Sequence, residues 1–168
     1  MRSVADARDA ELRGGPARTR CLVRYRSVDA SPDVVWDAFL RVLWRGGAGL
    51  GPPPAIEDPG TPHGLGCTRY IALGGRRSIR ERIVEVEHPT RLVYRVLEVA
   101  GGAYPVRAHV GVVRFFPIGC AGTRVEWTIR YVPSPRAWVV AALTTRFVVA
   151  RYLRELEWAC SSRERHAS

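Results

Sequence analysis

The segment from Gly64 to Pro133 most constrains the fold, because it consists almost entirely of extended stretches joined by short turns. Alternating apolar and polar residues predict five strands in it, near residues 67–73, 78–86, 91–99, 106–116 and 123–132. Glycine pairs and a His-Pro-Thr turn separate these strands. Strands joined so tightly pair antiparallel. The block therefore predicts a single antiparallel sheet.

Two helical patterns flank this block, and a further strand is predicted over residues 20–28. Ser31-Pro32-Asp33 has the capping residue, the proline and the acid that favour a helix start. The second helix begins near Ser134-Pro135, and its apolar residues recur every three or four positions as far as Cys160. It should be roughly 37 Å long. We predict an α+β fold in which a curved antiparallel sheet of six to seven strands wraps around this helix and encloses a cavity.

The chain is long enough for one domain, which we place at residues 20–162. Residues 1–19 lack periodicity and are expected to form a disordered tail, and residues 163–168 a short one. Residues 45–64 are rich in Gly and Pro and predict a long irregular connection. Such a loop could be a flap over a pocket mouth or a passive surface loop, and the sequence leaves both open.

The formal net charge of +10 argues less for nucleic-acid binding than it first suggests. All 26 basic residues are Arg, and the chain lacks Lys, Asn and Gln, a bias that indicates a GC-rich coding sequence. The Arg residues are also scattered along the strands and form no dense tract. We therefore expect no nucleic-acid partner.

The cysteines and histidines show no spacing that indicates a metal site. Cys21, Cys67, Cys120 and Cys160 are far apart, which predicts reduced thiols and a cytoplasmic location. His63, His88 and His166 have no ligand spacing, so we expect no metal and no cofactor. The run from Ala137 to Ala150 is too short to span a membrane, and Arg146 interrupts it.

The order of elements and several short motifs resemble the SRPBCC superfamily (START-like, Bet v 1-like), in the branch of polyketide cyclases/dehydrases and lipid transport proteins. The resemblance covers roughly residues 20–160 and rests on Ser31 to Asp37, Gly64 to Arg69, Glu81 to Ile83, Tyr94, Gly122-Thr123 and the Glu126-Trp127 strand that ends at Pro133. It implies the helix-grip fold and a cavity for a small hydrophobic or amphipathic ligand of the lipid, polyketide or isoprenoid type. The alternative that it implies is a cyclase, aromatase or dehydratase that uses the same cavity.

A narrower similarity links the chain to plant abscisic acid receptors, through Gly66 to Arg69 and Glu81-Arg82. Glu126 falls where those receptors carry a pocket glutamate, but their gate, latch and pocket lysine have no counterpart here. The similarity therefore implies a cavity without hormone reception. Strand alternation conflicts with it at one point, because it turns Trp127 inward and Glu126 toward water. We expect Trp127 to face the cavity.

His109 and Glu81 are the candidates for acid–base chemistry. His109 alternates with apolar residues on one face of its strand, which would make it a general base in the cavity, or else a histidine at the surface or with its hydrogen bonds satisfied. Glu81 would be a pocket carboxylate, or a surface residue paired with Arg69 or Arg95. The pattern does not decide whether the protein is an enzyme.

We expect the ligand to contact the inward residues of the strands and of the last helix. These are Arg69, Ile71, Leu73, Glu81, Tyr94, His109, Val113, Trp127, Ile129, Thr145, Val149 and Tyr152. The sequence specifies neither the ligand nor the oligomeric state.

Overall fold

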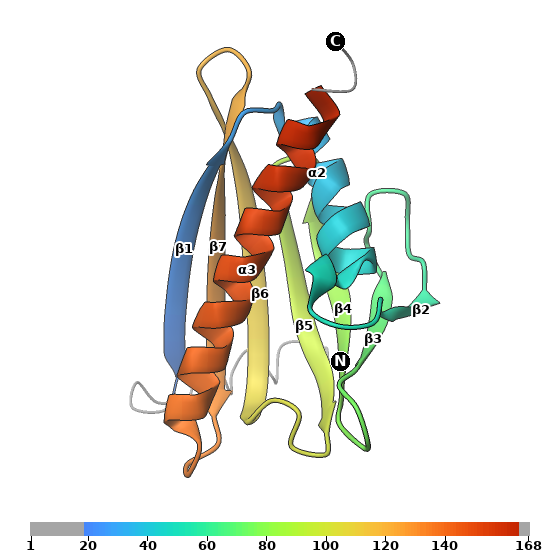
Figure 1. The fold of residues 1–168 in the computed structure, drawn as a ribbon, viewed down its shortest axis with the longest axis vertical. Helices are drawn as coiled ribbons and strands as arrows, with labels where there is room; N and C mark the ends of the chain where they lie inside the picture. Colours follow the sequence, from blue (N-terminus) through green and yellow to red (C-terminus); the bar gives the residue numbers. More distant parts are fainter. Residues whose placement is uncertain (1–18, 165–168) are drawn as a thin grey trace, which may run out of the picture.

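The computed structural model describes residues 19–164, which form one antiparallel sheet and the helices that its concave face holds (Figure 1). The seven strands follow the order β1-β7-β6-β5-β4-β3-β2. Their bounds are β1 Arg20–Val28, β2 Ala55–Asp58, β3 Thr68–Ala72, β4 Ser78–Glu87, β5 Arg91–Ala100, β6 Val106–Ile118 and β7 Gly122–Pro133. The expected tails lie outside the described residues, except that Thr19 is described and the last helix continues through Glu164.

Six of the strands lie where alternation predicts them, and β2 is the one that the sequence pattern missed. This strand has only four residues, stands at the edge of the sheet and pairs with β3 alone. It lies inside the Gly- and Pro-rich connection, where a strand this short leaves no recognisable periodicity. The expected irregular loop at residues 45–64 is therefore partly ordered.

The first helical pattern gives three short elements: α2 (Pro32–Ala38), the π-helical η1 (Phe39–Arg45) and the 3-10 turn η2 (Gly47–Gly49). Ser31 stands at the capping position, but its side chain makes no capping hydrogen bond. The proline in the first turn is therefore the residue that favours the start of the helix. The long helix α3 (Trp138–Glu164) begins later than Ser134-Pro135 predicts, because Ser134 and Ala137 first close a turn.

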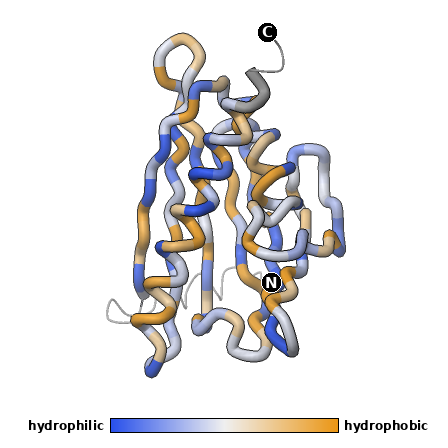
Figure 2. Tube along the Cα trace, in the orientation of Figure 1, coloured by the Kyte–Doolittle hydropathy of each residue, from blue (hydrophilic) through white to orange (hydrophobic). Residues whose placement is uncertain are grey.

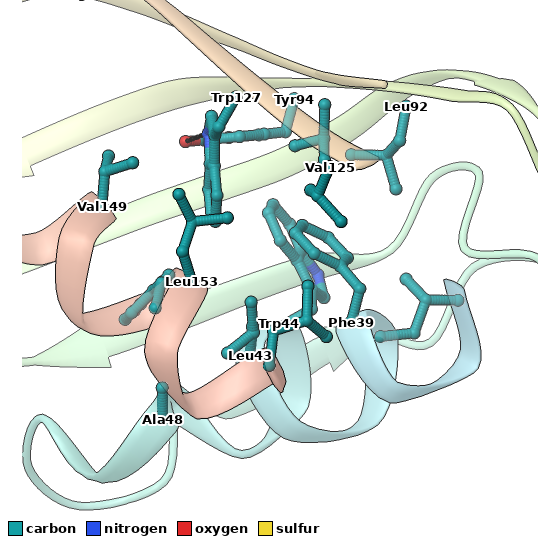
Figure 3. Packing of buried hydrophobic residues seen from close by; sticks show 14 of the residues in the cluster. Phe39, Leu43, Trp44, Ala48, Leu92, Tyr94, Val125, Trp127, Val149 and Leu153 are labelled. Carbon is teal, nitrogen blue, oxygen red and sulfur yellow. Dashed lines mark hydrogen bonds between the residues drawn. The ribbon is translucent and has the colours of Figure 1, made fainter. Parts of the chain in front are cut away.

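The solid part of the core lies where α2 and η1 pack against the sheet. The Phe39 ring lies 5.9 Å from Phe115 and 5.5 Å from Trp127, measured between ring centroids. Figure 3 shows Phe39, Leu43 and Trp44 pointing toward side chains of the sheet, with Val149 and Leu153 of α3 beside them. Aromatic rings thus fill one end of the concave face, and α3 covers the rest.

Gly111 allows one ring to lie flat on the sheet at the boundary of this core. It pairs directly with Tyr94 across β6 and β5. A Cβ atom at Gly111 would lie only 2.1 Å from Cε1 of Tyr94. The missing side chain therefore makes room for the Tyr94 ring, which is buried and lies beside His109 with 5.7 Å between ring centroids.

Candidate functional site

A cavity of about 290 Å³ lies between the sheet, α3 and the loop that follows η1. Each expected contact residue except Val113 lines it, namely Arg69, Ile71, Leu73, Glu81, Tyr94, His109, Trp127, Ile129, Thr145, Val149 and Tyr152. The two-residue period of the strands and the helical period of α3 predicted most of these residues, whereas the family resemblance favoured the pocket position of Glu81.

Val113 is fully buried but does not line the cavity. It shares the inward face of β6 with His109, yet it lies further along the strand, next to Phe115, whose ring packs against Trp36 of α2. One face of one strand thus serves the cavity at one end and the solid core at the other. Alternation predicts which face of the strand a residue occupies, but it does not predict whether that part of the face lies at the cavity or in the solid core.

Several lining residues come from loops, where the sequence offers no periodic signal. The connection after η1 contributes Gly47, Leu50, Gly51, Pro52 and Pro54, and the β5–β6 turn contributes Ala103 and Tyr104. Helix α3 adds Thr144, Phe147 and Val148 beyond the residues expected from it. The connection is therefore part of the cavity wall and not a passive surface loop.

The polar end of the cavity is built on a buried ion pair between Arg69 and Glu81, whose side chains are 4% and 9% exposed. The two residues lie directly opposite each other on β3 and β4, and Nε of Arg69 donates to Oε2 of Glu81 over 2.7 Å. Glu81 is thus paired with Arg69, as one of the two interpretations held, but inside the cavity and not at the surface.

The same guanidinium also holds the end of η1. Nη1 of Arg69 donates to the carbonyl oxygens of Leu43 and Trp44, at 2.7 and 2.9 Å. The guanidinium carbon lies 4.1 Å from the centre of the Trp44 ring, a cation–π contact. Burial alone would lower the pKa of Arg69, but Glu81 outweighs it and the pKa is raised, so the side chain remains charged.

His109 is buried in the cavity wall, and neither of its ring nitrogens has a hydrogen-bond partner among the described residues. The rings of Tyr94 and Tyr104 flank it at 5.7 and 5.6 Å between centroids. Burial lowers the pKa of His109 to about 4; Arg69 adds to this shift and Glu81 opposes it. The imidazole is therefore neutral near pH 7 and presents one donor and one acceptor.

Three tyrosine hydroxyls face the same space and remain protonated, because burial raises the pKa of Tyr94, Tyr104 and Tyr152. The Tyr94 oxygen accepts a hydrogen bond from Nε1 of Trp127 over 3.2 Å. Thr145 donates to the carbonyl of Ala141, so the Tyr104 hydroxyl donates to Thr145. The cavity thus combines aromatic walls with several neutral polar groups.

Trp127 faces the cavity, and Glu126 lies on the other face of β7, where it accepts a hydrogen bond from Arg114 over 3.0 Å. Alternation was therefore right, and the pocket position that the receptor similarity implied for Glu126 was wrong. No bulge in β7 reverses the alternation, because the register with β6 is unbroken from Ala108 to Ile118.

The described residues contain no cluster of three or more His, Cys, Asp or Glu that could hold a metal ion. Within the same part of the chain, no helix is long and apolar enough to cross a membrane. None of the four cysteines, all of which lie among the described residues, forms a disulfide; Cys67 and Cys160 are buried, and Cys21 and Cys120 are exposed.

A curved antiparallel sheet that grips a long C-terminal helix over an internal cavity defines the helix-grip class of proteins. The sequence model of the family described as polyketide cyclase / dehydrase and lipid transport matches residues 19–157, and the chain belongs to that family. This places it in the SRPBCC superfamily, as its motifs predicted. No functionally curated protein matches the sequence.

Solved structures share the fold at low sequence identity. The Zhui aromatase/cyclase from Streptomyces sp. R1128 is 18% identical, with a TM-score of 0.73 over 89% of this chain and 98% of that one. Norcoclaurine synthase from Thalictrum flavum is 16% identical, with a TM-score of 0.64 over 87% and 96%. A protein from Thermobifida fusca is 24% identical, with a TM-score of 0.63 over 82% and 90%.

The buried ion pair gives a first prediction, on stability. Arg69→Met or Glu81→Gln should each lower the free energy of unfolding by about 3–5 kcal/mol, because each leaves one buried charge without its partner. The double variant Arg69→Met/Glu81→Leu should lose less than either single variant. Urea unfolding near neutral pH measures all three. Arg80→Met, which breaks the exposed pair with Glu57, is the control and should change little. A double variant less stable than both single variants would contradict this account.

The depressed pKa of His109 gives a second prediction, on pH. The unfolded chain binds the proton near pH 6.5, whereas the folded chain does so only near pH 4, so acid favours unfolding between these values. The free energy of unfolding should fall by roughly 2 kcal/mol from about pH 7 to about pH 5 on this account. His109→Gln should abolish this loss, and His63→Gln, at an exposed site, should retain it. Identical pH profiles for the wild type and His109→Gln would contradict it.

Proposed function

We propose that this protein binds a small, mostly apolar molecule that carries one hydroxyl or carbonyl group. The observation that carries the proposal is His109, a buried neutral imidazole with two unpartnered nitrogens in the wall of a cavity. A buried polar group without a partner costs about 1–3 kcal/mol. A ligand that supplies the missing hydrogen bond recovers much of that cost.

The volume and walls of the cavity limit the ligand further. At about 290 Å³ the cavity is close to the lower bound of roughly 300 Å³ for small-molecule sites. Ile71, Leu73, Ile129 and Trp127 give it apolar and aromatic walls. This combination favours one or two fused rings, or a short branched chain, over a long acyl chain. Lipid, isoprenoid and polyketide fragments of this size all meet the requirement.

The electrostatics of the polar end favour a neutral ligand over an anion. Arg69 is the cation of the cavity, but Glu81 neutralises it, and its donors already serve two carbonyls of η1. A carboxylate ligand would have to compete with Glu81 for the guanidinium. Hydroxyl and carbonyl groups can instead use His109 and the protonated Tyr152 without breaking the ion pair.

A third prediction tests this function with two matched probes, naphthalene and a naphthol, which differ by one hydroxyl. Isothermal titration calorimetry should give about 3–10-fold tighter binding for the naphthol, the net value of one hydrogen bond. His109→Phe keeps an aromatic ring but removes both nitrogens, so the preference for the naphthol should decrease. His63→Phe, outside the cavity, should keep the preference. Equal binding of both probes to the wild-type protein would refute the role given to His109.

A second candidate function is catalysis of a cyclase or dehydratase type on a small keto compound. The neutral His109 beside protonated tyrosines favours it, as do the family and the structural likeness to an aromatase/cyclase. The imidazole would take a proton from the carbon next to a carbonyl, and the electron pair would move onto the oxygen. Tyr152 or Tyr94 would donate a hydrogen bond to that oxygen.

A fourth prediction separates this chemistry from binding alone. In deuterium oxide, the wild-type protein should accelerate exchange of the hydrogens beside the carbonyl of β-tetralone, followed by proton NMR. The rate should level off above about pH 5, where His109 is already neutral. His109→Phe should lose the acceleration. Exchange no faster than in protein-free buffer would leave binding as the function.

We also propose a cytoplasmic location and no nucleic-acid partner. The buried free thiol of Cys67 supports a reducing compartment. Two of the strand arginines that would otherwise attract phosphates are paired with carboxylates, Arg80 with Glu57 and Arg114 with Glu126.

A further inference from the structure

The first half of α3 carries large apolar side chains that are exposed to solvent. Val140, Leu143 and Phe147 are 56%, 61% and 61% exposed, and Trp138 and Val139 are 51% and 47% exposed. Figure 2 shows the contrast along the helix, with apolar residues concentrated in its first half and polar residues in its second. We call Trp138, Val139, Val140, Leu143 and Phe147 the α3 patch. Exposed apolar groups gathered in this way indicate a binding surface.

The charges around the α3 patch are of one sign. The sequence contains no Asp or Glu from Trp127 through Arg154, a stretch that includes Arg146 and Arg154. At 100° per residue, both of these exposed arginines fall on the same side of α3 as Leu143 and Phe147. The guanidinium of Arg20 lies 5.4 Å from the Trp138 ring. The patch is thus an apolar surface surrounded by cations.

The patch is continuous with the mouth of the cavity. Phe147 belongs to the patch and also lines the cavity. Gly51, Pro52 and Ala72 are further lining residues that are exposed, so they also lie at the rim. The β3–β4 turn next to Ala72 carries Arg76 and Arg77, both exposed. Apolar surface therefore leads from the outside of α3 into the cavity, with arginines on either side.

We propose that the α3 patch docks on the surface of an anionic lipid bilayer. A bilayer offers both parts of the required complement, an apolar phase for the patch and phosphates for the arginines. No helix among the described residues could cross a bilayer, so the protein lies on its surface. A second copy of the chain fits worse, because Arg146 and Arg154 would face their own positive counterparts.

Docking places the mouth of the cavity against the apolar phase. An apolar ligand could then pass between bilayer and cavity along Phe147 without crossing water. This consequence rests on the proposed ligand binding, but the docking itself does not. The two can therefore fail independently, since a protein without a ligand could still dock, and a ligand-binding protein could fail to do so.

A fifth prediction tests docking by flotation of the full chain with vesicles. Phosphatidylcholine vesicles that contain about 30% phosphatidylglycerol should bind it, and pure phosphatidylcholine vesicles or added salt should weaken binding. The variant Val140→Ser/Leu143→Ser should bind at least about tenfold more weakly, since two side chains no longer insert. Arg146→Gln should weaken binding about fivefold. Neither change touches a lining residue, so naphthol binding should remain at the wild-type level.

The matched control is Tyr25→Ser/Ile118→Ser, which removes two exposed apolar side chains away from α3. Ile118 lies at the β6–β7 hairpin, at the opposite end of the sheet from the start of α3 (Figure 1). This variant should bind the vesicles like the wild type. Three results would overturn the proposal: no binding to anionic vesicles, equal binding by the Val140→Ser/Leu143→Ser variant, or a dimer in solution that this variant dissociates. If anionic vesicles do not bind, the patch would instead fit a protein partner. If the variant dissociates a dimer, the partner would be a second copy of the chain.

Discussion

The cavity depends on how the charge of Arg69 is satisfied inside the protein. An unpaired buried guanidinium would be prohibitively costly, so its partners are held in fixed positions. Glu81 comes from the adjacent strand, and two further partners are carbonyls at the end of η1, a helix terminus that otherwise leaves such acceptors unsatisfied. One side chain therefore joins the sheet to η1, and so fixes where the loop that covers the cavity begins.

This arrangement also explains why His109 stays neutral and without a partner. Glu81 is the carboxylate that opposes the lowering of its pKa, but Arg69 is paired with that carboxylate. Desolvation therefore dominates, and it disfavours the imidazolium. The same desolvation keeps the surrounding tyrosines protonated. A cavity with neutral donors and acceptors is the result, which suits a ligand with hydroxyl or carbonyl groups and could also support proton transfer at carbon.

Much of the site could be predicted from periodicity, and the exceptions share a cause. Trp127 and His109 followed from strand alternation, and Tyr152 from helical spacing, because these periods fix which face a residue occupies. Val113 was placed wrongly since alternation does not show where along β6 the cavity ends. Tyr104 and Pro52 were missed because loop residues have no period. Glu126 shows that a family position can mislead where the strand's own pattern is clear.

The sequence by itself determined the sheet, the long helix and the set of inward-facing residues, because local spacing on a strand or helix dictates which side chains share a face. Only the tertiary structure decided that Arg69 and Glu81 pair inside the cavity, and that the inward face divides into a solid core and an open space. It also decided that no other described residues cover the exposed apolar side chains of α3. These features depend on which elements pack against each other, and contacts between residues distant in sequence leave no periodic trace in it.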